Sequence, residues 1–286
     1  MVPCPSDPLT GCFTEGATVF WASDCLSYAI QRDGSIEQGI TAEQLAPIVE
    51  EGFRAWGDVS CANGGTPPMT ALSQGPIACD AAEFNCQVPE LNSNLIVFRD
   101  DFVDRDVFRE GVIALTTLTA STRTGQIFDA DIEINSRDEE FVLGEPPAGS
   151  FARDLRGVLN HEIGHLLGLS HSKTRSALMY DDYRGTVLPA ADDIAGICAI
   201  RKGTGSDPSC EVVELAPDAG CVGNDKSCKV QPPPPPEEED PGCACALPAA
   251  GRRGHGAWVA ALLLGGWLRR RGRRGARGGH TLAERT

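Results

Sequence analysis

Hydrophobic and polar positions follow strand-like and helix-like patterns along the first two hundred residues. Residues 26–31 and the apolar run 95–98 are predicted strands, and 111–119 and 125–135 are two further strands joined by a short polar turn. Residues 60–94 show no such pattern and are expected to form a loop. The patterns therefore predict a sheet whose later strands come before the main helices.

Three helices are predicted. The capping-box pattern Thr41–Gln44 opens the first, which should run to about Val59, and Pro47 leaves its start uncertain by about a turn. The second should begin near Ser150 as N-cap and end at Leu167. The third covers residues 189–200 and has acidic residues in its first turns, where they favour the helix dipole.

Twelve cysteines without a C-x-x-C pair indicate disulfides, and hence an exported protein. Three groups are expected to form cross-links: Cys4 with Cys12, then Cys61, Cys79 and Cys86 within a loop, then Cys210, Cys221 and Cys228 within an appendix. The first residues lack the basic and apolar regions of a secretory signal peptide. Either the sequence begins at an internal position or its signal has been lost.

The charge of the chain excludes one class of partner. The net charge is −15, although nine of the 25 basic residues are arginines after Gly251. The preceding part is therefore much more acidic than the whole and would repel a phosphate backbone. We expect no nucleic-acid partner.

The stretch from His161 to His171 carries the chemistry. His161 and His165 lie four residues apart, so that a helix presents both imidazoles on one face. Glu162 is placed beside them. Gly168 can adopt a left-handed conformation, which would end the helix and return the chain so that His171 supplies a third ligand.

Three neutral imidazoles leave one tetrahedral position open, as in a catalytic zinc site. Zinc lowers the pKa of water toward roughly 7, so that Glu162 can act as the general base in peptide hydrolysis. Iron or copper on the same histidines is the alternative metal assignment.

The motif and its sequel resemble the metzincins, and within them the matrixins. Ser176-Ala-Leu-Met179-Tyr180 is similar to the Met-turn, which implies that Met179 lies beneath the histidines. Tyr183 matches a tyrosine on the wall of the pocket for the substrate residue just after the cut. The resemblance implies an α/β (α+β) zincin fold, with a twisted, mostly parallel five-stranded mixed sheet and three main helices. Residues 111–119 would be the edge strand that pairs with substrate.

The resemblance is incomplete. The second zinc of many matrixins needs three more histidines, and only one catalytic zinc is expected here. Calcium is a further candidate, although a solvated acidic face is the favoured account of the residues concerned. They are Asp129, Asp131, Glu133, Asp138, Glu139 and Glu140. The propeptide cysteine motif of the family is also absent, because Cys4 does not match it.

The C-terminal part has a different composition. It resembles a bacterial MYXO-CTERM sorting signal, with Cys243, the apolar run 257–268 as a short helix, and arginines after it. This implies export, transient membrane insertion, cleavage near Cys243 and display at the cell surface. An uncleaved membrane tether is the alternative. The expected organisation is an N-terminal Cys/Pro-rich segment (1–24), a matrixin-like catalytic domain (25–203), a Cys-containing appendix (204–231), a Pro/acidic linker (232–242) and the tag (243–286).

These observations predict a monomeric zinc endopeptidase that acts on extracellular proteins or peptides, either secreted or anchored at the surface. The alternative from another class is a catalytically silent surface adhesin that keeps the fold and only binds peptides.

Overall fold

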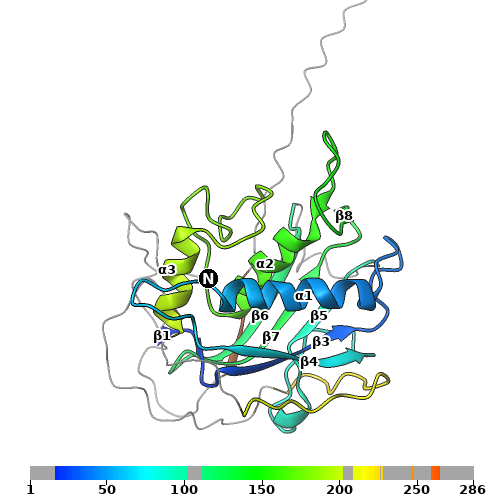
Figure 1. Cartoon of the computed structure of the whole chain (residues 1–286). Coiled ribbons are helices and arrows are strands. Elements are labelled where there is room, and N and C mark those ends of the chain that lie inside the picture. The colour runs from blue at the N-terminus through cyan, green and yellow to red at the C-terminus, as the bar shows by residue number, and fades with distance from the viewer. Residues whose placement is uncertain are drawn as a thin grey trace, which may run out of the picture.

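A mixed sheet lies at the centre of the fold, with two helices packed on one side of it (Figure 1). The computed structural model describes residues 17–101, 111–201, 209–225, 227, 246–247 and 259–264. The expected α/β fold class is confirmed in this part of the chain, which contains a largely parallel sheet and three α-helices. The predicted Cys4 to Cys12 cross-link lies outside the described residues.

The central sheet has the strand order β11-β6-β7-β5-β3-β4, and β2 also pairs with β7. Strands β4, β3, β5 and β7 are mutually parallel, whereas β6 and β11 run antiparallel to their neighbours. The strands of this sheet are β2 (Phe20–Trp21), β3 (Cys25–Gln31), β4 (Thr70–Ile77), β5 (Leu95–Phe98), β6 (Ala114–Ser121), β7 (Gln126–Ile134) and β11 (Val259–Leu264). Two short pairs, β1 (Ala17–Thr18) with β10 (Ala246–Leu247) and β8 (Phe141–Val142) with β9 (Arg153–Asp154), lie outside it.

Four of the five expected strands were placed in the sequence and correspond to β3, β5, β6 and β7, but the fifth, β4, was missed. Residues 60–94 were predicted to be loop, whereas β4 occupies residues 70–77 of this range. Gly75, at φ 88°, and Pro76 hide the strand in the sequence pattern, and the pairing with β3 shifts register there. Both residues are tolerated because β4 is the last strand in the sheet order and carries this bulge.

The C-terminal apolar segment was predicted to contain a short helix, yet Val259–Leu264 is strand β11, paired with β6. Within the described residues, no helix has the length and apolar character needed to cross a membrane. The remainder of the predicted tag, apart from the short β10, lies outside the described residues.

The first and third helices begin and end close to their predicted positions. Helix α1 covers Ala42–Gly57, and Thr41 caps it through the expected capping box with Gln44. Helix α3 covers Ala191–Ile200. The buried stripe of α1, which includes Leu45, Phe53 and Trp56, packs against the sheet and against the second helix.

The second helix, α2, covers Leu155–Leu166, and its predicted start at Ser150 is wrong. The N-cap is Asp154, whose Oδ1 accepts a hydrogen bond from the Arg156 N–H at 3.0 Å. Ser150 instead makes a local turn, because its hydroxyl accepts from the Ala152 N–H at 3.0 Å. Residues 153–154 then pair with β8, which keeps them extended.

Residues 209–225 lie on the side of the sheet opposite α1 and α2 and belong to the same body (Figure 1). Leu215 and Ala219 pack against apolar side chains of this face, and the Leu215 N–H donates to the Gln74 carbonyl at 2.9 Å. Two of the three cysteines expected to close a separate appendix are joined to the sheet instead, by the disulfides Cys25–Cys210 and Cys79–Cys221, and Cys228 lies outside the described residues.

A third disulfide, Cys61–Cys198, joins the segment after α1 to α3. Cys86 is disulfide-bonded as well. Two of the staples expected within residues 60–94, Cys61 and Cys79, therefore connect segments that lie more than a hundred residues apart in the chain. Such cross-links stabilise a fold chiefly by restricting its unfolded chain.

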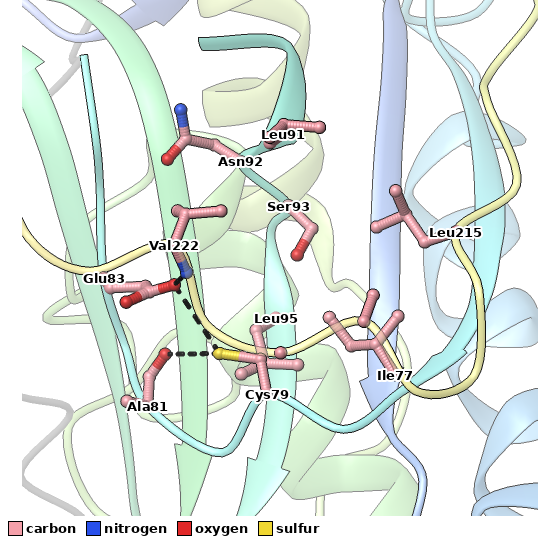
Figure 2. Close-up of a pocket in the computed structure, with 12 residues that line it drawn as sticks. Ile77, Cys79, Ala81, Glu83, Leu91, Asn92, Ser93, Leu95, Leu215 and Val222 are labelled. Carbon is pink, nitrogen blue, oxygen red and sulfur yellow. Dashed lines mark hydrogen bonds between the residues drawn. The ribbon is translucent and has the colours of Figure 1, made fainter. Parts of the chain in front are cut away.

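Between residues 209–225 and the sheet is a pocket of about 230 Å³ (Figure 2). Its wall is mainly apolar, with Ile77, Leu95, Leu215 and Val222 around it and the Cys79–Cys221 disulfide at one side. Successive residues of a strand point to opposite faces, and Ile96 faces α2. The pocket is therefore separated from α2 by the sheet.

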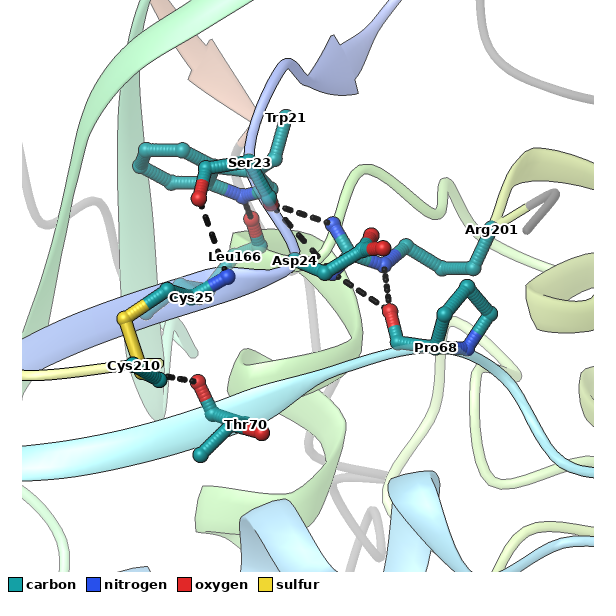
Figure 3. Close-up of polar contacts among 9 residues, drawn as sticks. All are labelled: Trp21, Ser23, Asp24, Cys25, Pro68, Thr70, Leu166, Arg201 and Cys210. Carbon is teal, nitrogen blue, oxygen red and sulfur yellow. Dashed lines mark hydrogen bonds and ion pairs between the residues drawn. A yellow bond between two sulfur atoms is a disulfide. The ribbon is translucent and has the colours of Figure 1, made fainter. Parts of the chain in front are cut away.

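The end of α3 is tied to the start of the sheet through a buried arginine (Figure 3). The Arg201 guanidinium donates to the Pro68 carbonyl at 2.8 Å and forms an ion pair with Asp24 at 3.4 Å. Nearby, the Trp21 indole N–H donates to the Leu166 carbonyl at 2.8 Å. Part of the predicted irregular segment 1–24 thus takes part in the core, and the two ends of the domain are held together.

A solvated acidic face was expected on and after β7, and this holds only for Asp138 and Glu140, which are exposed. Asp129, Asp131 and Glu133 are buried, and Glu133 pairs with Arg99. Asp131 accepts the Leu95 N–H at 2.8 Å and the Glu83 N–H at 2.9 Å. Asp138 and Glu139 pair with the arginines 137 and 153, respectively. The hydrogen bonds of Asp131 and the ion pairs of Glu133 and Glu139 offset the cost of burying these three carboxyl groups.

The buried Asp131 should make stability depend on pH. Burial raises its pKa to about 8, the charge of Glu133 adds to this, and hydrogen bonds from the Leu95 N–H and Asp129 oppose it. Between about pH 4 and about pH 8 the unfolded carboxyl ionises while the folded one keeps its proton. The free energy of unfolding should therefore fall as pH rises, by up to about 1.4 kcal/mol per pH unit.

Asp131→Asn, which stays neutral, should flatten this decline, as measured by urea denaturation at several pH values in the same range. Equal slopes in the variant and the wild type would contradict the assignment of a retained proton to Asp131.

Candidate metal centre

Helix α2 holds His161, Glu162 and His165 in the interior of the protein. Their exposed fractions are 2%, 0% and 1%, respectively. Polar side chains are buried in this way only when other groups satisfy them, so each of their atoms must be accounted for.

The chain turns sharply after α2, as the sequence predicts. Gly168 has φ 107°, and the N–H groups of Gly168 and Leu169 donate to the carbonyls of His165 and Gly164, both at 2.9 Å. A Cβ at position 168 would also lie 3.2 Å from the Val19 carbonyl oxygen. Glycine is needed for this turn, which brings His171 back to the helix.

The three histidines form one cluster. Their ring centroids are 4.8 to 5.3 Å apart, and one nitrogen from each lies within 4.8 Å of the others. All three Nε2 atoms are buried and have no hydrogen-bond partner. Converging nitrogens of this kind fit a metal ion.

The other ring nitrogen fixes the tautomer of two histidines. Nδ1 of His161 contacts the Leu178 carbonyl oxygen at 2.7 Å, and Nδ1 of His165 contacts the Leu169 carbonyl oxygen at 2.8 Å. A carbonyl only accepts, so each Nδ1 donates its hydrogen. Nε2 then keeps its lone pair for a ligand, which is the usual arrangement around metal-bound histidine.

Electrostatics also favours neutral imidazoles. Burial lowers the pKa of His161 to about 4 and that of His171 to about 3, where His161 contributes further. Burial and the two neighbouring rings lower the pKa of His165 as well. The cluster is therefore uncharged at neutral pH and can bind a dication without first losing protons.

Glu162 is oriented by strand β6. Its Oε2 accepts from the Thr116 hydroxyl at 2.7 Å, whereas its buried Oε1 has no partner. Burial raises the pKa of Glu162 to about 8 and the Thr116 hydrogen bond opposes this. A dication on the neighbouring histidines would lower the pKa again. Such a carboxyl can take and return a proton near neutral pH.

Met179 lies against α2 at Gly164. A Cβ at Gly164 would overlap the Met179 sulfur, so the glycine creates the space for this side chain. Met179 is 2% exposed. Met179 thus packs on the helix that carries His161 and His165, and its role as a Met-turn beneath a metal stays a prediction.

Asp193 supports the turn at Leu178 and Met179. From the sequence alone it was considered only as a negative charge near the start of α3. Its carboxylate accepts from the N–H groups of Leu178 at 2.7 Å, Met179 at 3.0 Å and Ala190 at 2.7 Å. The Leu178 carbonyl in turn accepts from His161. Asp193 therefore holds the turn that orients a metal-ligand candidate, and only the distant contact with residues 178–179 reveals this role.

Tyr183 lies close to His161, and its predicted role in the wall of a substrate pocket stays a prediction. Together with His161 it lines a small cavity, and its hydroxyl accepts from the Asp154 N–H at 2.9 Å. Thr116 and Gly157 are two further residues of this region that the sequence pattern did not single out.

Asp193→Asn should weaken the centre. An amide that replaces the carboxylate places an NH₂ group against backbone N–H donors, which should lower the free energy of unfolding by about 1–3 kcal/mol. Zinc affinity should also fall, by about 10- to 100-fold, because the turn that orients His161 loosens. Chemical denaturation and zinc titration measure the two effects.

Asp192→Asn in the preceding position is the matched control, since Asp192 accepts only the Ser172 hydroxyl among the contacts described. If Asp193→Asn binds zinc as the control does, the supporting role of Asp193 is wrong.

Comparisons with known proteins bear on this region. Residues 96–201 match the family model described as Matrixin. Metalloendoproteinase 1-MMP of Arabidopsis thaliana is 26% identical over 183 residues, which cover 62% of this chain and 43% of that protein. Interstitial collagenase of Oryctolagus cuniculus is 52% identical over 58 residues, 20% of this chain and 12% of that protein.

Metalloendoproteinase 5-MMP of Arabidopsis thaliana is 45% identical over 67 residues, which cover 20% of this chain and 19% of that protein. The chain thus spans less than half the length of these relatives. The match includes all three histidines, Glu162 and Met179. Together with the fold, the comparisons support a matrixin-like metalloprotease in this part of the chain.

Proposed function

We propose that this protein is a zinc-dependent endopeptidase that cleaves extracellular proteins or peptides. One observation carries the proposal: three buried, unpartnered Nε2 atoms converge beside a buried carboxyl that also has a free oxygen. This donor set is poor for a structural role, because no group among the described residues satisfies it. It suits a metal that works together with a base.

His161, His165 and His171 would hold the ion. Three neutral imidazoles favour zinc and leave a coordination position for catalysis. A bound zinc ion supplies Lewis acidity, which polarises a peptide carbonyl and lowers the pKa of water toward roughly 7.

Glu162 is the proposed general base and acid. Thr116 fixes one of its oxygens, so that the free Oε1 can take a proton from water and then pass it to the leaving amine nitrogen. Leu178 and Leu169 hold the imidazole rings in place through their carbonyls. No side chain of the protein needs to act as a nucleophile.

A peptide-binding adhesin that retains the fold without activity is the rival function. An inactive protein has no need to keep a carboxyl buried at 0% exposure with one oxygen unpaired, because that arrangement lowers stability. The retained Glu162 therefore favours the enzyme.

The disulfides fit an exported protein. Display of the enzyme at the cell surface through residues 243–286, with cleavage near Cys243, and a monomeric state are parts of the proposal. They are supported by the sequence resemblance alone.

Glu162→Ala should lower kcat/KM on a mixed peptide library by about 10²- to 10⁴-fold, since the reaction loses its base. Zinc content should be retained, because Glu162 is not among the grouped ligand candidates. A chelator should abolish wild-type cleavage. Mass spectrometry of the digested library measures cleavage, and metal analysis of the purified protein measures zinc content.

Glu140→Ala removes an exposed carboxyl from the same domain and serves as the control, which should cleave as the wild type does. Cleavage by Glu162→Ala at the rate of Glu140→Ala would refute the mechanism. Absence of cleavage by the wild type with zinc bound would favour the adhesin.

A further inference from the structure

The cavity beside His161 is very small. Its volume is about 10 Å³, which is room for roughly one water molecule. It lies between Gly157 and His161 of α2 on one side and the residues 182–186 on the other. Because His161 is a ligand candidate, a substrate side chain next to the cleaved bond would enter here.

A glycine explains why the cavity is closed. A Cβ at Gly157 would lie 2.7 Å from the Thr186 carbonyl oxygen, so any other residue would push the segment 182–187 away from the helix. The missing side chain does not widen the cavity, since the backbone of this segment fills the space.

Two hydrogen bonds hold the segment in this closed position. The Asn160 side-chain amide donates to the Val187 carbonyl at 2.7 Å, and the Asp154 N–H donates to the Tyr183 hydroxyl at 2.9 Å. The Arg153 guanidinium also lies 5.9 Å from the centre of the Tyr183 ring. Tyr183 is thus fixed at both its ring and its hydroxyl.

We infer that this subsite accepts only a small side chain, so that the preferred substrates carry Gly, Ala or Ser next to the cleaved bond. Inserting a Leu or Phe side chain requires the segment 182–187 to leave α2 and to lose both hydrogen bonds. This inference rests on the proposed zinc site, which decides which substrate side chain faces the cavity. The small size of the cavity follows from the packing at Gly157 and Tyr183.

Binding of peptide hydroxamates to the zinc-loaded full chain tests it without turnover. The hydroxamate chelates zinc and fixes the register, and the first side chain is methyl, isobutyl or benzyl. The methyl compound should bind at least about tenfold more tightly than the other two. Tyr183→Ala, which removes the ring from the wall, should reverse or abolish this preference.

Leu188→Ala is the matched control, because Leu188 directly follows the segment 182–187, is 63% exposed and does not line the cavity. Equal affinity for the three compounds, or a preference left unchanged by Tyr183→Ala, would overturn the inference. Zinc content measured beforehand separates this result from failure of the proposed metal site.

A second observation concerns the outer edge of β6. Strand β6 borders the site, because its Thr116 contacts Glu162. One edge of β6 pairs with β7, so that its opposite edge can pair with a further strand. Strand β11 occupies that edge over six residues in antiparallel register, from Val259 opposite Ser121 to Leu264 opposite Thr116.

A strand edge binds an extended peptide through backbone hydrogen bonds. A peptide substrate and β11 would therefore compete for the same donors and acceptors of β6. We propose that residues 259–264 are an internal competitor that restricts access to the edge beside Glu162 until the C-terminal part is removed or displaced. This proposal uses the same site as the proposed function.

The test compares Leu262→Pro/Leu263→Pro with Leu262→Val/Leu263→Val in the full chain. Adjacent residues of a strand direct their N–H groups to opposite sides, so one of residues 262 and 263 donates its N–H toward β6. The double proline variant lacks both N–H groups and therefore loses this hydrogen bond, whereas the double valine variant keeps it. Amide hydrogen exchange of residues 114–121 should become faster in the proline variant alone. The KM for an extended peptide should fall together with it.

Equal amide exchange rates of residues 114–121 in the two variants would overturn the proposal that residues 259–264 compete for β6, whether or not the protein cleaves peptides. Faster exchange without peptide cleavage would instead count against the proposed enzymatic function.

Discussion

The site depends on hydrogen bonds between imidazole Nδ1 atoms and backbone carbonyls. Because Leu178 and Leu169 accept these hydrogens, the Nε2 atoms of His161 and His165 face one point as acceptors. The Leu169 carbonyl follows the turn at Gly168, and the Leu178 carbonyl belongs to the turn at Met179. The sheet, α3 and the disulfides matter to the chemistry because they hold these two turns against α2.

The support for these turns extends across the domain. Asp193 anchors residues 178–179 to α3, and the Cys61–Cys198 disulfide joins α3 to the segment after α1. Arg201 continues this connection to the start of the sheet. Two glycines permit close approach at the centre, Gly164 for the Met179 sulfur and Gly157 for the segment after it. The same packing that orients the ligand candidates thus also limits the space for substrate.

Local patterns in the sequence predicted much of this arrangement. The capping box at Thr41 and the apolar run 95–98 each depend on neighbouring residues only, and both agree with the structure. Strand β4 was missed because Gly75 and Pro76 oppose strand formation locally and the pairing with β3 compensates. The start of α2 depends on the pairing of residues 153–154 with β8, and the disulfide partners and the burial of Asp131 depend on contacts distant in sequence. Local patterns contain no signal for such contacts.

Metal analysis tests the central claim most directly. The full chain is purified without added metal, and its metal content and zinc affinity are compared with those of His171→Ala and of His255→Ala, which changes a histidine outside the motif. The account predicts about one zinc ion per chain in the wild type and in His255→Ala, and loss of the bound ion in His171→Ala. Iron or copper in place of zinc, or zinc bound equally well by His171→Ala, would contradict it.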